Sequence, residues 1–588
     1  MDSDIQSSAI KGMDRLYEFE REPVSQDRLQ SGKHFAGVYA GEHVAGTEFV
    51  IGALFVAWGA TVYDIFVGLL LGNLMAVLTW TFVCAPIAVQ TRLTLYWYLR
   101  RIAGPVTTTI YNILNAVLFC ILAGCMITVS ASAVRIPFKI PPQTNWYPQD
   151  VRFVLVVIGV GALVVTLAIL GFKKLAQFSE VCSPWMFLMF IAGAVAIFPI
   201  LAKEVLGGQM GSLDDFWKIA GEKIWTGKAP DGRQPIGFWH VAAFAWICNL
   251  AMHGGLSDMA LLRYAKRSSY GLYSAFGMFL GHYLAWICAG IMGATTALIL
   301  GTIIDKLDAG GVANQALGFT GIIAVVIAGW TTSNPTLYRA GLAFQAVTPG
   351  WPRWLVTLVA GAVTTAVACF PFVFLKLLGF VSLYGLLLMP VGAIVFVEHW
   401  IFPKIGLTQF WVSKKKLLVS WPALASWAIA MAAALVLERT GTIHLFFLFV
   451  PVWVLTAVLY IIFASMAGAR EKFADEKQEQ PAEHITGEAA DSGLGHPRKG
   501  PVGPADESKV RMPKWTEAPK KADVVLWICG AVALASLAAC IILPIWVYTT
   551  SGEDYERNFA WFKRMLIWPT LVYFIAGTIW AVKRDKAE

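Results

Sequence analysis

The chain has 588 residues, of which 57% are hydrophobic and only 14% are charged. A soluble domain carries roughly a quarter of charged residues, so this composition excludes an ordinary soluble protein. The formal net charge of +8 does not indicate a nucleic-acid partner, because the basic residues lie in loops between apolar runs, where membrane orientation accounts for them.

Apolar runs long enough to cross a bilayer recur along the chain, since a spanning helix needs about 20 residues. Residues 1–35 are polar, contain nothing that resembles a cleaved signal peptide, and are predicted to form a cytoplasmic tail. Hydropathy then predicts about fourteen spans in an all-α polytopic membrane protein. They cover residues 36–61, 64–89, 105–131, 151–172, 183–202, 237–261, 271–301, 317–345, 354–374, 377–398, 420–437, 443–467, 523–549 and 560–582.

The distribution of Lys and Arg predicts the orientation of these spans. If the N-terminus is cytoplasmic, the loops on that side carry most of the basic residues, and short cytoplasmic loops are enriched in them. Those residues are Arg92, Arg100, Arg101, Lys173, Lys174, Arg263, Lys266, Arg267, Arg353, Lys404, Lys414, Lys415 and Lys416. Both termini are therefore predicted to be cytoplasmic, in a bacterial-type inner or plasma membrane, and the long loop 203–236 is predicted to be extracytoplasmic.

Residues 469–522 differ in kind from the rest of the chain. They are rich in Lys, Glu, Asp, Gly and Pro and contain few large apolar residues. Such a composition predicts a disordered cytoplasmic linker. It separates a twelve-span body from a terminal region, residues 523–588, with two spans and a short tail.

The first predicted span contains three ionisable residues, Glu42, His43 and Glu48, beside several glycines. A charge near the middle of a bilayer costs at least about 2.5–3.5 kcal/mol. Glycines that flank Glu48 favour a helix that unwinds and frees carbonyl oxygens for a cation. Glu42 and His43 have a simpler alternative, in which both are solvated at the membrane interface.

The sixth predicted span has a similar polar interruption. Trp246, Asn249 and His253 precede the pair Gly254 and Gly255 in an otherwise apolar helix. The face of Trp246 can stack on a planar solute, and the amide of Asn249 can both donate and accept hydrogen bonds. Alternatively, Trp246 serves packing and Asn249 bonds a neighbouring helix.

The eighth predicted span contains Thr331, Thr332, Ser333 and Asn334 directly before Pro335. Adjacent hydroxyls can supply oxygen ligands to a hard cation such as Na⁺. In the alternative, these hydroxyls bond only the carbonyls of their own helix near the proline.

The third and tenth predicted spans supply further candidates. Asn115 and Phe119 lie four residues apart in the third, so they share one helix face. In the tenth span, Gly392 is predicted to serve close packing.

The two interrupted spans lie five spans apart. Two five-span halves have opposite orientations in the membrane, and interrupted helices at matching positions indicate an inverted-repeat transporter. The repeats are predicted at residues 36–202 and 237–398, with residues 399–468 forming the eleventh and twelfth spans.

Four sequence segments resemble the nucleobase–cation symporter family, which includes cytosine, purine, hydantoin and allantoin permeases. They are DIFVGLLLGNLMAVLTW followed by CAPIAVQTRL in the second span, SDMALLRYAKR after the sixth, WTTSNP in the eighth, and FVSLYGLLLMPVGAIVFVEHW in the tenth. The order and spacing of the segments agree with the family over residues 35–468. The linker and the final two spans fall outside the resemblance.

The resemblance implies a LeuT-type fold of two inverted five-helix repeats with discontinuous first and sixth spans. It also implies a sodium site between the first and eighth spans and a solute site among the first, third, sixth and eighth. The implied sodium ligands are Ala45, Glu48, Ala328, Thr331 and Thr332, and the solute-binding candidates are Glu48, Asn115, Phe119, Trp246, Asn249 and Asn334. The sequence departs from the family pattern at Phe119, where relatives often have Trp, and at the additional polar residues Glu48 and His253.

These observations predict a secondary active transporter that carries a small polar solute, such as a nucleobase, with a cation by alternating access. Thr331 and Thr332 favour Na⁺, whereas Glu48, with His43 or His253, offers an alternative site for H⁺. No cofactor is expected besides the coupling ion. A proton-coupled permease for another polar compound and a transporter-like sensor remain alternatives, and the oligomeric state is left open.

Motifs of other functional classes are absent from the sequence. It contains no HExxH, GxSxG or Walker motif, so an enzyme is not predicted. No repeated selectivity-filter segment indicates a channel. The nine cysteines contain no CxxC pair and have no regular spacing with His, so neither a disulfide framework nor a zinc site is predicted.

Overall fold

The computed structural model describes residues 18–229, 232–371, 377–473, 524–550, 552 and 554–587. Most of the described residues are helical, and their only β pairings are two isolated bridges, Gln30 with Ala265 and Thr61 with Thr226. Ten helices in the described part are long and apolar enough to cross a membrane, or eleven if one bent pair counts as a single span. The chain is therefore an integral membrane protein of the all-α class.

The predicted spans correspond to the following elements. They are α2 (Gly32–His43) with α3 (Glu48–Ala57), the span Asp64–Thr91 that contains α4 (Leu69–Thr79), α6 (Leu95–Val134), α7 (Val151–Ile169), α8 (Phe172–Leu206), α10 (Phe238–Ile247) with α11 (Leu250–His253) and α12 (Met259–Leu262), the span Ser268–Leu300 that ends in α13 (Trp286–Leu300), α15 (Phe319–Gln345), α16 (Arg353–Ala368), α18 (Leu377–Phe396), α20 (Trp421–Arg439), α21 (Phe449–Ala467), α22 (Val524–Thr549), and α23 (Tyr555–Met565) with α24 (Ile567–Ala587).

Three of the fourteen predicted spans are not among the helices that are long and apolar enough to cross a membrane. The helices α10 and α16 are apolar but shorter than 18 residues. The third is α15, whose apolar first half is followed by the polar residues 331–334 and by Arg339, which lower its mean hydropathy.

The first span is broken, as its glycines and ionisable residues predict. The helices α2 and α3 are bent by 51° across residues 44–47. At the break, a Cβ on Gly46 would lie 2.9 Å from Val129 of α6 and 3.1 Å from the carbonyl of Val325 in α15. The unwound segment therefore passes too close to these two helices for any side chain at this position.

The sixth span is broken as well. The helix α10 ends at Ile247, two short helical turns follow as α11 and α12, and Leu256 between them has a positive φ of 63°. The predicted discontinuities of both spans are confirmed. The irregular backbone is buried among neighbouring helices, which is where irregular backbone is tolerated at membrane depth.

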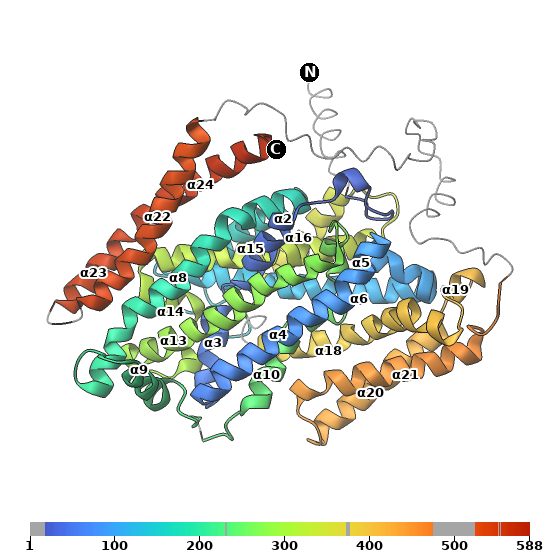
Figure 1. Cartoon of the computed structure of the whole chain (residues 1–588), viewed down its shortest axis with the longest axis horizontal. Helices are drawn as coiled ribbons and strands as arrows, with labels where there is room; N and C mark the ends of the chain where they lie inside the picture. Colours follow the sequence, from blue (N-terminus) through green and yellow to red (C-terminus); the bar gives the residue numbers. More distant parts are fainter. Residues whose placement is uncertain are drawn as a thin grey trace.

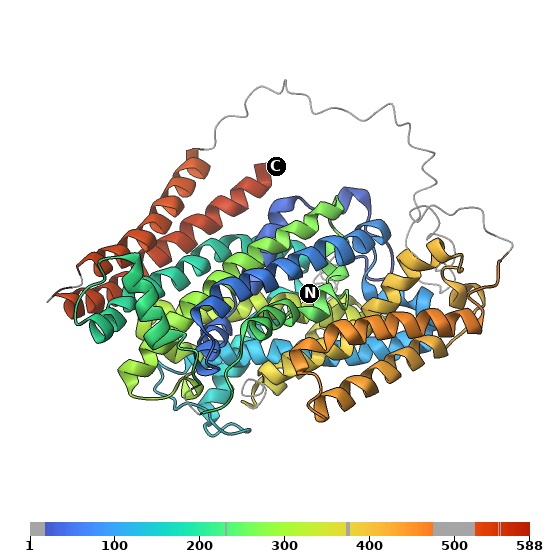
Figure 2. The same ribbon diagram turned by 60° about the horizontal axis from the view of Figure 1, so that its bottom comes forward.

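The two broken spans lie within a bundle organised around α15. This helix packs against α6, α8, α16 and α2. On one flank of the bundle, α20 and α21 pack on each other and on α18, and on the opposite flank α22 and α24 form a pair against α8 (Figures 1 and 2). The terminal pair of helices is thus attached beside the bundle.

Residues 18–31, which fall within the predicted cytoplasmic tail, pack against the bundle. The guanidinium of Arg263 donates to the carbonyls of Phe19 at 2.5 Å and Glu18 at 2.7 Å. The hydroxyls of Tyr264 and Tyr338 donate to the Glu18 carboxylate at 2.7 and 2.8 Å. This segment therefore covers the end of the bundle at which α2 begins.

Of the predicted linker 469–522, all but residues 469–473 lie outside the described residues.

Candidate functional site

A small cavity of about 50 Å³ lies at the break between α2 and α3. Its lining combines two carboxylates, two imidazoles, an amide and several hydroxyls. The lining residues are Glu42, His43, Ala45, Thr47, Glu48, Ile51, Leu122, Met126, Cys248, Asn249, Met252, His282, Thr332, Thr336, Val381 and Tyr384. Sites for small molecules usually measure about 300–1,000 Å³, so the structure is closed around this polar centre.

Next to the cavity, Arg339 of α15 holds two carboxylates. Its Nη1 lies 2.5 Å from Glu42 Oε1 and its Nη2 lies 2.9 Å from Glu42 Oε2. Its Nε donates to Asp258 Oδ1 at 3.0 Å, and Nη2 also contacts this oxygen. The other oxygen of Asp258 accepts from the hydroxyl of Tyr39 at 3.0 Å and from the indole of Trp80 at 2.5 Å.

This ion triad is fully removed from solvent, because Arg339 and Asp258 are 0% exposed and Glu42 is 2% exposed. Buried charges persist when they are paired and hydrogen-bonded, and all three groups here meet that condition. The triad joins α15 to the end of α2 and to the segment between α11 and α12. The alternative in which Glu42 and His43 are solvated at the interface is therefore wrong, since both are 2% exposed.

A second ionisable cluster surrounds Glu48 at the start of α3. The indole N–H of Trp286 donates to the Glu48 carboxylate, and Nε2 of His282 lies 3.8 Å from Oε1 of Glu48. The His282 ring stacks on Trp286 at 4.3 Å and meets the edge of His43 at 5.1 Å. The buried atoms His43 Nε2 and His282 Nδ1 have no hydrogen-bond partner among the described residues. Two imidazoles able to accept or donate a proton thus line the cavity together with Glu48.

The residues proposed to hold a cation meet where α15 crosses the unwound segment. The hydroxyl of Thr332 donates to the carbonyl of Glu42 at 2.8 Å and to that of Ala328 at 3.0 Å. The hydroxyl of Thr331 donates to the carbonyl of Ala328 at 3.1 Å and lies 3.7 Å from the sulfur of Met186 in α8. The carbonyl of Ala45 accepts from the backbone N–H of Glu48 at 3.1 Å.

This oxygen set is of the kind that Na⁺ prefers, because it consists of hydroxyl and carbonyl oxygens. Thr332 faces the break and lines the cavity, whereas Thr331 is turned toward α8. Within the described residues, no group of three or more His, Cys, Asp or Glu side chains is arranged to hold a metal ion.

Among the predicted solute-binding residues, Glu48 and Asn249 line the cavity. The amide nitrogen of Asn249 is buried and has no partner in the described part of the chain. The structure places Trp246 elsewhere, because its indole donates to Thr79 at 3.0 Å and its ring packs against Phe449 of α21 at 4.4 Å.

Two more of these candidates, Phe119 and Asn115, are buried without lining the cavity. The ring of Phe119 is buried and packs edge-on against that of Tyr384, with their centroids 5.9 Å apart. Tyr384 itself lines the cavity. The amide of Asn115 donates to Tyr111 and to Ser257, each at 3.2 Å.

Two further candidates also lie outside the lining. Asn334 is fully buried in α15. His253 bonds the carbonyl of Trp246 at 2.9 Å, and its ring contacts that of Trp80 at 4.8 Å. Trp246, which was expected to stack on a planar solute, therefore does not face the cavity in this structure.

Sequence reasoning did not single out Arg339 or His282. Arg339 falls within the predicted eighth span, so the cost of a charge at membrane depth applies to it as much as to Glu48. His282 is a lone polar residue in the apolar run FLGHYLAW. Both signals were present, but neither residue has a sequence neighbour that indicates its partner.

A scan against models of protein families finds no match, and neither does a comparison with curated protein sequences. Solved structures do match. A closed, bromovinylhydantoin-bound structure of Mhp1, a nucleobase-cation-symport-1 family transporter, has a TM-score of 0.60 at 16% identity, over 78% of this chain and 98% of that chain.

Two further structures agree with this match. An inward-facing structure of Mhp1 has a TM-score of 0.55 at 16% identity, over 76% of this chain and 94% of that chain. A substrate-bound, outward-open Na⁺-coupled sialic acid symporter has a TM-score of 0.56 at 14% identity, over 80% of this chain and 98% of that chain.

The chain has the LeuT-type fold. The prediction of this fold is confirmed, and the structural neighbours include the family whose motifs the sequence resembles. At these sequence identities the likeness establishes the fold alone.

Proposed function

We propose that this protein is a secondary active transporter that moves a small polar solute together with a cation by alternating access, with Na⁺ as the favoured ion. The observation that carries the proposal is the meeting of the Thr332 hydroxyl with the carbonyls of Glu42 and Ala328 at the break in the first span. Unwound helices in transporters of this type free carbonyl oxygens for a coupling ion near the membrane midplane.

In the proposed transport cycle, the ion triad stabilises a closed state. Arg339 ties α15 to Glu42 on α2 and to Asp258 after α11. Movement of α2 away from α15 must separate these charges, so the triad opposes opening at the end of the bundle that residues 18–31 cover. A cation held between Thr332 and the Glu42 carbonyl favours the same contact. The ion and the solute are coupled if each binds one state better than the other.

A nucleobase or related heterocycle is the proposed solute, on the basis of the motif resemblance. The cavity lining supports a polar solute with hydrogen-bond donors, because Glu42 and Glu48 supply carboxylate oxygens and Thr336 and Tyr384 supply hydroxyls. Mhp1, one of the structural neighbours, has been solved with bromovinylhydantoin bound. Cytoplasmic placement of both termini belongs to the proposal and rests on the distribution of Lys and Arg.

Uptake into proteoliposomes tests the proposal. Nucleobases, hydantoins and other small polar solutes are offered with and without an inward sodium gradient. Accumulation of one solute class that requires the gradient is the expected result, and Thr332→Ala is expected to abolish the requirement whereas Thr332→Ser retains it. Uptake that is independent of both the sodium and the proton gradient would show that transport is not coupled to either ion and would indicate a facilitator. Binding without uptake would indicate a sensor.

Proton coupling is the second candidate function, and the cluster of Glu48, His282 and His43 favours it. Glu48→Gln keeps an acceptor for the Trp286 N–H but removes the acidic proton site. Under proton coupling, this variant loses the dependence of uptake on a pH gradient while its sodium response is unchanged. The opposite pattern, loss of the sodium response alone, would remove this candidate.

A further inference from the structure

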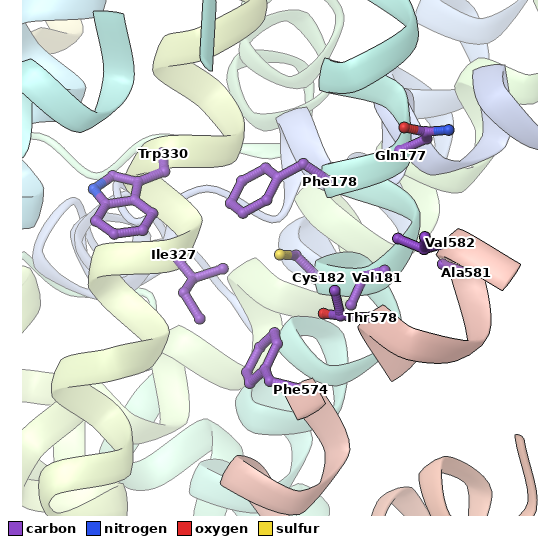
Figure 3. A pocket seen from close by; sticks show the side chains of 10 residues that line it. All are labelled: Gln177, Phe178, Val181, Cys182, Ile327, Trp330, Phe574, Thr578, Ala581 and Val582. Atoms are coloured by element: carbon purple, nitrogen blue, oxygen red, sulfur yellow. The ribbon is translucent and has the colours of Figure 1, made fainter. Parts of the chain in front are cut away.

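A second and larger cavity lies outside the central site, between α24 and the bundle. It has a volume of about 310 Å³, six times that of the central cavity, and is formed by α8, α15 and α24. Figure 3 shows Phe178 and Cys182 of α8, Ile327 and Trp330 of α15, and Phe574 of α24 around it. Its volume reaches the lower end of the range for small-molecule sites, and its lining is almost wholly apolar.

Two hydrogen bonds and an ion pair hold α24 against α8 beside the cavity. The indole of Trp185 donates to Thr570 at 3.1 Å, and the hydroxyl of Tyr573 donates to the carbonyl of Val181 at 2.7 Å. Closer to the end of the chain, Arg584 pairs with Glu180 at 2.5 Å. The cavity is therefore built into the packing of the terminal helices on the bundle.

The surroundings of the cavity belong to the hydrocarbon layer. The terminal helices carry exposed apolar side chains, including Trp527 at 72%, Leu534 at 70% and Ile575 at 65% exposure. Such surfaces on spanning helices face lipid, so the molecules that reach this cavity from the side are lipids. An acyl chain matches both the apolar lining and the position at membrane depth.

One end of the cavity has a basic rim. Along α8 the lining ends at Gln177, one turn after Lys173 and Lys174, and Lys174 donates to the Gln177 amide oxygen at 3.0 Å. Along α24 the lining ends at Val582, directly before Lys583 and Arg584. Four basic residues thus lie at or just beyond the ends of the lining on these two helices. One of them, Arg584, pairs with Glu180, which also contacts His34. Basic clusters between spanning helices at the cytoplasmic side attract anionic lipid headgroups.

We propose that this cavity is a binding site for an anionic phospholipid, whose acyl chain lies among Phe178, Trp330 and Phe574 and whose headgroup phosphate lies at the basic rim. Binding does not depend on the proposed transport function. The two terminal helices, which lie outside the sequence resemblance, complete the site. Ile327 and Trp330 flank Ala328 on α15, so a bound lipid contacts the helix that carries the candidate cation site.

Native mass spectrometry of the purified full chain tests this site. The protein is titrated with phosphatidylglycerol or phosphatidylcholine of identical acyl chains, and one tightly bound phosphatidylglycerol per chain is expected. Thr578→Trp places a large ring in the cavity from an exposed position and is expected to reduce binding of both lipids. Ile579→Trp on the same helix is the matched control, since this residue is 40% exposed and lies outside the lining.

A second variant tests the headgroup independently of the acyl chain. Lys173→Ala with Lys174→Ala alters only exposed side chains, and each basic residue near an anionic headgroup contributes about fivefold in affinity. The double variant is expected to reduce the preference for phosphatidylglycerol by at least about fivefold while phosphatidylcholine binding is unchanged.

Three results would overturn the proposal. The first is equal binding of the two lipids by the unaltered protein, and the second is equal loss of binding in Thr578→Trp and Ile579→Trp. The third is competition by glycerol phosphate at the concentration of the lipid, since that compound carries the charge without an acyl chain.

Discussion

Arg339 and Glu42 lie 297 residues apart in sequence and form a two-point ion pair in the centre of the bundle, with N–O distances of 2.5 and 2.9 Å. The same guanidinium also holds Asp258. A single side chain of α15 therefore neutralises charges on both broken spans.

Removal of this guanidinium is expected to be severely destabilising. Arg339→Leu leaves Glu42 and Asp258 buried without their cation, and breaking a buried pair in this way costs about 3–5 kcal/mol. Thermal unfolding in detergent measures the loss. Arg557→Ala is the control, because Arg557 pairs with Asp554 at the surface, at 3.1 Å and 76% side-chain exposure. Exposed pairs contribute at most about 1 kcal/mol, so similar losses in both variants would contradict the role of the triad.

The two adjacent threonines of α15 are expected to differ in their effect on sodium. Thr332 bridges to the Glu42 carbonyl, whereas Thr331 is turned toward Met186. Thr332→Ala should weaken sodium affinity about tenfold or more, since a contact to a charged group contributes about 1.5–3 kcal/mol. Thr331→Ala should weaken it less. Sodium titrations of the unfolding temperature compare the variants, and an equal effect of both would argue against a site at the break.

Trp286 is expected to be necessary for the buried state of Glu48. Trp286→Phe removes the indole N–H that bonds the carboxylate and leaves a buried acceptor unsatisfied, at a cost of about 1–3 kcal/mol. Glu48→Gln retains an acceptor and should cost less. Chemical denaturation compares them with Trp239→Phe, which alters a residue that is 66% exposed. Glu48→Gln as damaging as Trp286→Phe would show that the charge, and not the hydrogen bond, stabilises the fold.

Gly392 of α18 is expected to tolerate no side chain. A Cβ there would lie 1.9 Å from the carbonyl oxygen of Gly254, in the broken sixth span. Gly392→Ala must move one backbone against the other, and overpacking of this kind typically costs about 1–3 kcal/mol. Gly379→Ala on the same helix meets no atom within 4 Å and should be neutral or slightly stabilising. Unfolding temperatures of the two variants that fall together would refute close packing as the role of Gly392.

The architecture could be predicted from local properties of the sequence. Long apolar runs give the spans, and the glycines beside Glu48 and His253 mark the two breaks, because both depend on residues close together in the chain. The close packing predicted for Gly392 is consistent with its contact with Gly254. The burial of Glu42 could not be predicted from the sequence, because it depends on an ion pair with Arg339, which is distant in the chain.

The directions of the side chains at the two breaks could not be predicted from the sequence either. Trp246 precedes the end of α10 by one residue, and its orientation toward Thr79 and Phe449 depends on how α10 packs against α4 and α21. Helical periodicity does not predict in which direction a side chain points once the helix has been interrupted by an irregular turn. The same limit applies to Thr331 and Thr332, which are adjacent in sequence but contact different helices.

The wide sequence separation within the ion triad has a consequence for biosynthesis. Ribosomes add about 5–20 residues per second, so Arg339 emerges about 15–60 s after Glu42, which precedes it by 297 residues. During this interval the carboxylate of Glu42 has no guanidinium to pair with. The ion triad therefore assembles only after the eighth span has been synthesised.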